Sequence, residues 1–500
     1  MANDIQKQWA NPSDILSLLL LVGGDIVQKA IAQMVGHVIA IPSRPHIRLH
    51  IAPVAFSFGC VAYGFTNLLA AVGDMKLMPA PDHRSLTINC ATGFARETNS
   101  WVLGRLLRDH KLRHPVDARS IEEGGRAECV RIDTFYLKPV LNPSFDLVWW
   151  SGWCTLFTQL VISIIPGVVE GDWRIMLVTV SGVFLIAVTC AMPQWTEEKW
   201  TGRTLQKEKV ICLTSGNGSH HILVLIGLQG SWDLETLAVG MSRPRAETRW
   251  LSLILAILWI CLLLTIPGLQ EHTWSLIVIG GLGMLQNVFA AGTGRMPCSS
   301  NFHITPFSSA PTIIGRRQPY QDAEDGHACL PVHDAELAGV KNWLAAREKA
   351  QRQPRSTSFV QPEQMPPWLA TMSKEDGVPP WLETIRPVVG NRESPPSGST
   401  MCKRSKFISG VWRWLQLDEP KPCDVVYAIG VHGALRELEK WVPTAGLAMV
   451  QIFFPGGLVF NEASIRDNID KRFWKTAYHT VAIRKKAAET SQVKKSRQQP

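Results

Sequence analysis

The sequence predicts a membrane protein: an all-α bundle of five or six transmembrane helices with a small cytosolic α+β portion and a partly disordered C-terminal tail. Three observations predict this class. Apolar residues are gathered into long runs, and 19 Trp outnumber 5 Tyr, which is typical of side chains at the boundary between headgroups and hydrocarbon. The basic residues behind the net charge of +9 lie beside the apolar runs. They favour a lipid bilayer, and not nucleic acid, as the partner.

Five charge-free segments are long enough to cross a bilayer. A hydrocarbon core of about 30 Å needs about 20 residues of helix. The segments that meet this length are Ile51–Gly73, Leu147–Val169, Ile175–Thr196, Trp250–Gln270 and Thr273–Gly294. Because soluble helices rarely run so far without a charge, all five are predicted as spans.

The segment Ile15–Ile41 has two interpretations. Its apolar part, Ile15–Gly24, is half a membrane thick and is followed by Asp25, Gln28 and Lys29. A charge at the bilayer centre costs roughly 2.5 kcal/mol or more. A sixth span is favoured, with Asp25 and Lys29 one turn apart and facing protein. An interfacial amphipathic helix is the alternative.

The loops between the spans predict the topology. Eleven Lys and Arg lie between Gly73 and Leu147, and seven lie between Thr196 and Trp250. The positive-inside rule places both loops and the C-terminal tail in the cytosol, in an endomembrane or the plasma membrane. Interfacial tryptophans are then expected at both ends of the spans. Those at the cytosolic ends are Trp149, Trp150, Trp195 and Trp250, and those at the outer ends are Trp173 and Trp274.

The loops and the tail also contain patterns of regular structure. β-branched and aromatic residues predict strands, and charge alternating with Leu predicts an amphipathic helix. Two apolar runs around a Gly-Asn-Gly turn predict a hairpin. The predicted strands are Ser85–Cys90, Glu128–Leu137, Lys209–Thr214 and His221–Gly227, and the helices are Asn99–His110 and Ala434–Trp441. Prolines and glycines limit Thr444–Phe460 to a short interfacial or buried helix. One α+β domain built from both loops and part of the tail is expected.

The predicted regions follow one another along the chain. They are an N-terminal segment with a candidate first span (1–50), a span (51–73), a cytosolic loop (74–146), a transmembrane hairpin (147–196), a cytosolic loop with a β-hairpin (197–249), a second transmembrane hairpin (250–294), a cytosolic tail (295–350), a disordered linker (351–410), an ordered cytosolic segment (411–480) and a basic terminus (481–500).

The linker contains the sequence Pro-Pro-Trp-Leu twice. The copies are Pro366, Pro367, Trp368 and Leu369, and Pro379, Pro380, Trp381 and Leu382. A proline pair fixes an extended backbone and the Trp supplies a large apolar anchor, and two copies raise avidity. Docking of a cytosolic protein partner is the functional interpretation. Docking on the chain's own soluble domain, or chance in a Pro-rich stretch, is the alternative.

Few other residues point to chemistry. Asn217 fits the N-glycosylation pattern, but the predicted topology places it in the cytosol, at a turn that itself favours Asn and Gly. Within the spans the polar residues are Asn67, Gln159, Gln286 and Asn287, and Asp25 is the ionisable residue at depth. Either a transport path or helix–helix hydrogen bonding accounts for them. No motif for a cofactor, a metal or a nucleotide is assigned.

Four segments resemble a group of uncharacterised multi-pass membrane proteins of filamentous fungi, some of them apparently encoded near secondary-metabolite genes. The segments are Ser13–Gln33, Pro53–Phe65, Ser100–His110 and the sequence SGNGSHHILVLIG, residues 215–227. The resemblance implies a fungal membrane protein associated with a biosynthetic pathway, and it transfers no functional residues.

Three functions follow as hypotheses. A non-enzymatic membrane scaffold or accessory protein is preferred, because much soluble sequence lies on one face and the spans hold few polar groups. A small-metabolite transporter, working as a homo-oligomer, would need one cavity lined by Asp25, Asn67 and Gln286. A membrane-bound biosynthetic enzyme would need a polar pocket in the loops, for which the candidates are Asp82, His220 and His221. No catalytic residue is assigned.

Overall fold

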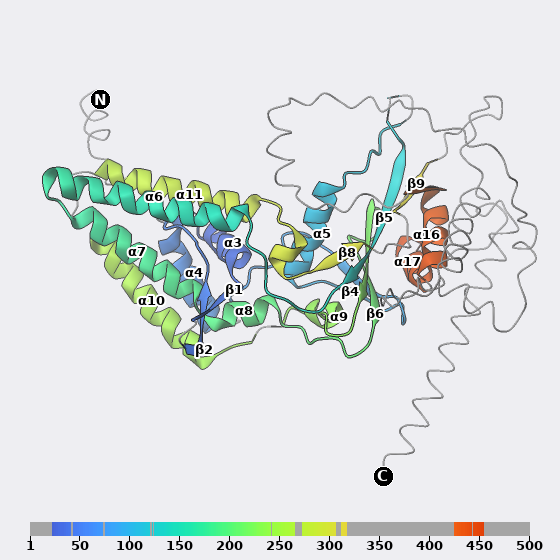
Figure 1. The fold of residues 1–500 in the computed structure, drawn as a ribbon, viewed down its shortest axis with the longest axis horizontal. Coiled ribbons are helices and arrows are strands. Elements are labelled where there is room, and N and C mark those ends of the chain that lie inside the picture. The colour runs from blue at the N-terminus through green and yellow to red at the C-terminus, as the bar shows by residue number, and fades with distance from the viewer. Residues whose placement is uncertain are drawn as a thin grey trace, which may run out of the picture.

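A computed structural model describes residues 23–317, apart from 42–43, 74–75, 121–122, 124, 242, 266–272 and 307–311, and residues 425–454 apart from 443. These residues form two parts that lie side by side (Figure 1). The first is a bundle of apolar helices, called here the helical region. The second is an eight-stranded sheet with helices on both faces, called here the sheet domain.

The helical region contains two helix pairs that point away from the sheet domain (Figure 1). Helix α6 (Leu147–Glu170) is followed by α7 (Arg174–Cys190), and α10 (Ala246–Thr265) is followed by α11 (Thr273–Gly292). Three of these, α6, α10 and α11, are long and apolar enough to cross a membrane. A fourth crossing results if α7 and α8 (Pro193–Lys199), which are bent by 46°, count as one span. Among the described residues, this count does not reach the five or six spans predicted.

The outward faces of these four helices are apolar. Phe157, Leu177, Leu264 and Leu285, one from each helix, are about 70% exposed, at 71%, 69%, 72% and 70%. Exposed apolar surface of this extent is typical of contact with lipid or with another protein. Trp150, Trp173, Trp250 and Trp274 are exposed near helix ends, as predicted for interfacial positions. The same prediction is wrong for Trp149 and Trp195, which are buried in protein contacts.

The predicted continuous span over Ile51–Gly73 is wrong. An antiparallel hairpin of β1 (His37–Ile41) and β2 (Arg44–Ile51) is followed by an extended stretch, and helix α4 begins only at Gly59 and ends at Val72. Pro53 contributes to the break, because the residue before a proline avoids helical backbone angles. The predicted span over Ile15–Ile41 also ends early, since α3 (Gly24–Met34) gives way to β1. Residues 15–22 lie outside the described residues.

Residues 53–58, called here the extended segment, are buried between helices α6 and α11. Non-helical backbone inside a bundle needs hydrogen-bond partners from the protein. Gln159 Nε2 donates to the carbonyl oxygens of Phe56, at 2.6 Å, and of Ile279, at 2.8 Å. Asn287 Nδ2 donates to Ala55 O at 3.1 Å. Polar side chains within these helices therefore satisfy the backbone of the extended segment.

Glycines on the neighbouring helices make room for the extended segment. A Cβ atom at Gly152 would collide with Pro53 O, one at Gly283 with Phe56 O, and one at Gly280 with the ring of Phe58. Small residues such as Gly280 and Gly283 in apolar helices commonly allow two helices to pack closely. They instead allow an extended chain to approach the helix.

The sheet domain collects strands from four separate stretches of the chain. Its strands are β3 (Leu86–Asn89), β4 (Ala95–Glu97), β5 (Glu128–Leu137), β6 (Lys209–Thr214), β7 (His221–Gly227), β8 (Ile304–Pro306), β9 (Thr312–Arg316) and β10 (Val425–Ile429). The order is β10-β9-β5-β7-β6-β3-β4, with β8 paired to β5. Strands β5, β6 and β7 occupy the predicted ranges. The two loops and the tail thus form one mixed sheet, as expected.

Helices cover both faces of the sheet (Figure 1). Helix α5 (Trp101–Arg113) and the short α9 (Leu234–Leu237) lie on the face toward the helical region, and α16 (Gly430–Trp441) and α17 (Ala445–Phe453) lie on the other. In β7, Ile222 and Val224 pack under α16 and α17, whereas Leu223 and Leu225 pack toward α5. Burial of both faces explains why this strand is continuously apolar. Helix α17 is the buried helix predicted in the tail.

Candidate functional site at the junction of helices and sheet

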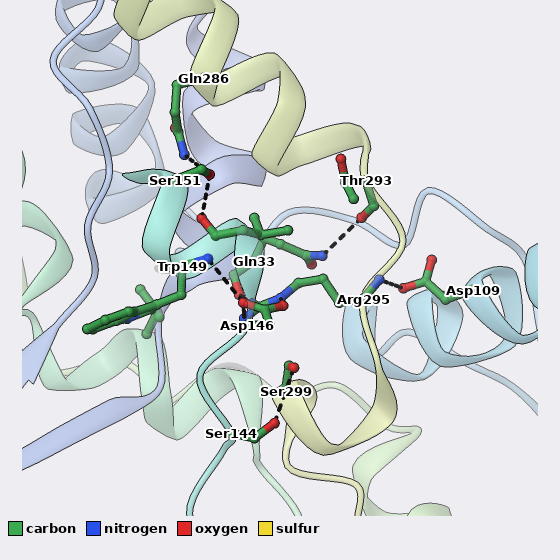
Figure 2. Close-up of polar contacts among 12 residues, drawn as sticks. Gln33, Asp109, Ser144, Asp146, Trp149, Ser151, Gln286, Thr293, Arg295 and Ser299 are labelled. Atoms are coloured by element: carbon green, nitrogen blue, oxygen red, sulfur yellow. Dashed lines mark hydrogen bonds and ion pairs between the residues drawn. The ribbon is translucent and has the colours of Figure 1, made fainter. Parts of the chain in front are cut away.

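A buried arginine lies where the helical region meets the sheet domain. Arg295 follows the end of α11, and only 1% of its side chain is exposed. Its guanidinium forms a bidentate pair with Asp146, with Nε to Oδ2 at 2.6 Å and the second nitrogen to Oδ1 at 2.8 Å. Its remaining nitrogen donates to the carbonyl oxygen of Gln33 (Figure 2). Two-point pairing of this kind fixes geometry as well as charge.

The same group of contacts joins four helices. Asp146 is the N-cap of α6, and its Oδ1 accepts a hydrogen bond from the backbone N–H of Trp149 at 3.0 Å. The backbone N–H of Arg295 donates to Asp109 Oδ2 on α5 at 2.9 Å. Gln33 belongs to the last turn of α3. Arg295 therefore ties the end of α11 to the start of α6, the end of α3 and the sheet-domain helix α5 (Figure 2).

Other cations satisfy the last carbonyl groups of α11 and α3. Arg105 donates to Ala291 O at 2.6 Å and pairs with Asp82 at 2.7 Å. Lys199 Nζ donates to the carbonyl oxygens of Gln33, at 3.2 Å, and Val35, at 2.7 Å. The C-terminal carbonyls of a helix lack intrahelical partners, and a cation there also interacts favourably with the helix dipole. The junction is therefore held by charges and not by apolar contact alone.

A histidine beside the junction is kept neutral by its surroundings. His37 on β1 is buried and stacks on Phe145, with ring centroids 4.9 Å apart. Burial, Arg295 and Lys199 lower the pKa of His37 to about 4. Because the pKa lies well below 7, this imidazole is neutral at physiological pH.

The three intramembrane residues named for a transport path have different surroundings. Asp25 is exposed in the first turn of α3. Asn67 is buried on α4, and Gln286 is buried on α11, where its Nε2 lies 3.4 Å from Ser151 Oγ. Within the described residues, no hydrogen bond or ion pair joins any two of the three. The structure thus gives them no shared contact.

The remaining candidates from the sequence do not meet in one site. Asn217 is exposed at the tip of the β6–β7 turn. Asp82 is paired with Arg105, and His220 Nδ1 donates to Cys129 O at 2.8 Å. Both copies of Pro-Pro-Trp-Leu lie outside the described residues.

His221, the third enzyme candidate, belongs to a buried histidine group under α5. Its Nε2 donates to His114 O at 2.6 Å, and its ring is 6.3 Å from that of His110. His110 Nε2 lies 3.0 Å from Asp133 Oδ2. Burial lowers the pKa of His114 and of His221 to about 4. Within the described part of the chain, no three His, Cys, Asp or Glu side chains are placed to hold a metal ion.

Sequence reasoning missed the junction because its residues are far apart along the chain. Arg105, Arg108 and Lys199 were counted only among the basic loop residues that predict topology, and two of them, Arg105 and Lys199, are buried. The only local signal was Asp146 immediately before an apolar run, which is typical of an N-cap. Nothing in the sequence around Arg295 identifies its partners.

No protein-family model, no curated protein and no solved structure matches this chain. The fold and the junction define its class: a helical region, in which three helices are long and apolar enough to cross a membrane, fixed by buried charges to a mixed-sheet domain.

Proposed function

We propose that this chain is a membrane-anchored scaffold that recruits a cytosolic protein through residues 318–424. The observation that carries the proposal is where this stretch begins and ends. Strands β9 and β10 are parallel neighbours, with Thr312 opposite Val425 and Arg316 opposite Ile429. The stretch 318–424 is therefore attached at both of its ends to one edge of the sheet domain. A partner bound to this stretch would be held near that edge.

The junction supports a scaffold because it would hold the sheet domain in one orientation on the membrane. Arg295 and its partners connect that domain to three helices of the bundle. Rigid positioning raises the effective concentration of a tethered partner. The resemblance to fungal membrane proteins encoded near secondary-metabolite genes makes a biosynthetic enzyme the partner class we propose.

The two copies of Pro-Pro-Trp-Leu are the docking elements in this proposal. Trp368→Ala combined with Trp381→Ala should abolish recovery of the partner from a detergent extract. Either single change should weaken it, because losing one of two sites removes avidity worth about 10²-fold or more. Quantitative mass spectrometry of proteins recovered with the tagged full chain measures this.

Trp343→Ala is the matched control, since Trp343 is also followed by Leu but not preceded by two prolines. It should leave recovery unchanged. Deleting residues 361–384 should reproduce the double variant. Full recovery of the same proteins by the deletion variant would contradict the docking proposal.

We further propose five membrane crossings, the fifth formed by Ile15–Gly24 together with α3. The N-terminus of α3 packs inside the bundle, where Gly23 lies against Met284 of α11, and the helix ends at the junction. Its 11 residues cover about 16 Å, so the apolar stretch before it would supply the other half of a membrane of about 30 Å.

Five crossings place the two ends of the chain on opposite sides of the membrane. A tag before residue 14 should be protected from protease in sealed cytosol-side-out vesicles, while one after residue 500 should be cleaved. Asn217 should carry no glycan, because the same topology keeps it cytosolic. Cleavage of both tags in intact vesicles, or a glycan on Asn217, would contradict this topology.

A further inference from the structure

A serine, a lysine and a histidine from three separate elements meet at the rim of the sheet domain. Ser215 is the first residue after β6, Lys111 lies in the last turn of α5, and His83 precedes β3. Lys111 Nζ is 2.6 Å from Ser215 Oγ and 3.1 Å from His83 Nε2, and His83 Nε2 is 3.1 Å from Ser215 Oγ. All three are half-buried, so a ligand can reach them.

Each of the three side chains is held by its own element. Gly104 lets the backbone of His83 approach α5, since a Cβ there would lie 2.8 Å from His83 O. The neighbouring Asp82 is anchored by Arg105. The turn after Ser215 is closed by a hydrogen bond from the Ser219 N–H to Gly216 O at 3.1 Å. The backbone around His83 and Ser215 is therefore fixed by the fold.

The turn beside Ser215 has an open face. Gly216 and Gly218 adopt positive φ angles of 101° and 80°, which glycine adopts without strain. A Cβ at Gly218 would meet nothing within 4 Å, and one at Gly216 would meet only Leu86. Backbone N–H groups in such glycine-rich turns can bind an anion. Space is thus available next to the serine.

We propose that Ser215 is a nucleophile, with Lys111 as its general base, that acts on an acyl ester or thioester. This activity goes beyond the scaffold and does not depend on any partner. A serine hydroxyl is a weak nucleophile until an adjacent base accepts its proton, and serine–lysine pairs perform this chemistry on several unrelated folds. His83 contacts both groups and positions them.

The reaction is balanced without an added redox partner. Neutral Lys111 accepts the proton from Ser215 Oγ as the oxygen attacks the carbonyl carbon. The carbon–oxygen or carbon–sulfur bond to the leaving group breaks, and the leaving alcohol or thiol takes the proton from Lys111. Water then attacks the acyl-serine, with Lys111 again accepting and returning a proton. The products are the carboxylic acid and the regenerated serine.

The surroundings of Lys111 favour its role as a base. Burial lowers the pKa of Lys111, and burial together with Lys111 lowers the pKa of His83. The neighbouring charges are Asp82 and Arg108. A lysine with a lowered pKa has a larger neutral fraction at physiological pH, and general base catalysis needs that form.

The place of the cluster fits a substrate at a membrane surface. Lys111 lies six residues, or about 9 Å of helix, after Arg105. The Arg105 side chain contacts the end of α11, a candidate spanning helix. An acyl chain anchored in the bilayer could place its ester there.

The test uses the full chain purified in mild detergent and an alkyl fluorophosphonate probe, with the labelled residue found by mass spectrometry. Ser215 should be labelled, and Ser215→Ala should abolish labelling and the turnover of p-nitrophenyl butyrate. Ser219→Ala, in the same turn, should remain labelled at Ser215. Lys111→Arg keeps the charge and a donor but cannot act as a base, so it should slow labelling by about 100-fold or more.

A pH profile adds a readout that a structural role would not change. Because the base must be neutral and its pKa is lowered, the labelling rate should rise with pH and reach half its maximum below about 10.4, the ordinary pKa of lysine. Failure to label Ser215 in the folded chain would overturn the proposal. A labelling rate for Lys111→Arg within about threefold of the wild type would also overturn it.

Discussion

Replacing Arg295 by Ala is expected to lower the free energy of unfolding by about 3 kcal/mol, because it removes the cationic partner of the half-buried Asp146 carboxylate. Asp146 would lose both of its bonds to the guanidinium, and the carbonyl oxygen of Gln33 would lose a donor. Chemical denaturation of the full chain in mild detergent, followed by Trp fluorescence, measures the change.

Two further variants make this result specific to the pair. Arg84→Ala removes a charge from an exposed residue and should change stability by less than about 0.5 kcal/mol. Replacing both partners, as Arg295→Met with Asp146→Leu, should cost less than Arg295→Ala alone, since no unpaired charge remains. A loss below about 1 kcal/mol for Arg295→Ala would show that the pair does not hold the junction.

Gly283→Ala is expected to have the second large effect. The added Cβ would collide with Phe56 O and lie 2.7 Å from Gln159 Nε2, so either the extended segment or α11 must shift. Overpacking of this kind costs about 1–3 kcal/mol, and more where backbone must move. We therefore expect a loss of at least about 3 kcal/mol in the free energy of unfolding, together with lower yield of folded protein.

Gly281→Ala is the matched control two residues away. A Cβ at Gly281 would meet nothing within 4 Å. Alanine is favoured over glycine in a helix by roughly 0.5–1 kcal/mol, so this change should be neutral or stabilising. Equal losses from both substitutions would mean that α11 does not pack on the extended segment.

The elements that sequence reasoning located correctly are those with a strong local pattern. The apolar runs and the turn residues of the β6–β7 hairpin predicted the first and last residue of both strands correctly. The long apolar runs predicted α6, α10 and α11 correctly. A helix makes its backbone hydrogen bonds within its own segment, so it needs no distant partner. Helix α5 was also found from its charge pattern, although one of its charged residues, Arg105, is buried.

The wrong prediction of a continuous span over Ile51–Gly73 has a physical cause. Ile51–Gly73 has the composition of a span, and composition cannot distinguish a helix from an extended chain whose carbonyls are satisfied elsewhere. Here the donors are Gln159 and Asn287, more than a hundred residues away. In the described part of the chain, the helices long enough to cross are consequently fewer than the apolar runs.

By itself, the sequence determined that this protein has long apolar helices, a sheet assembled from both loops and the tail, and a repeated Pro-Pro-Trp-Leu segment. These depend on short-range periodicity and composition, which are written into neighbouring residues. Only the tertiary structure decided that Arg295 joins the two parts, that glycines accommodate an extended segment, and that Ser215 meets Lys111. Each of these depends on contacts between residues that are far apart in the sequence and are brought together by folding. Local composition and periodicity do not predict such contacts.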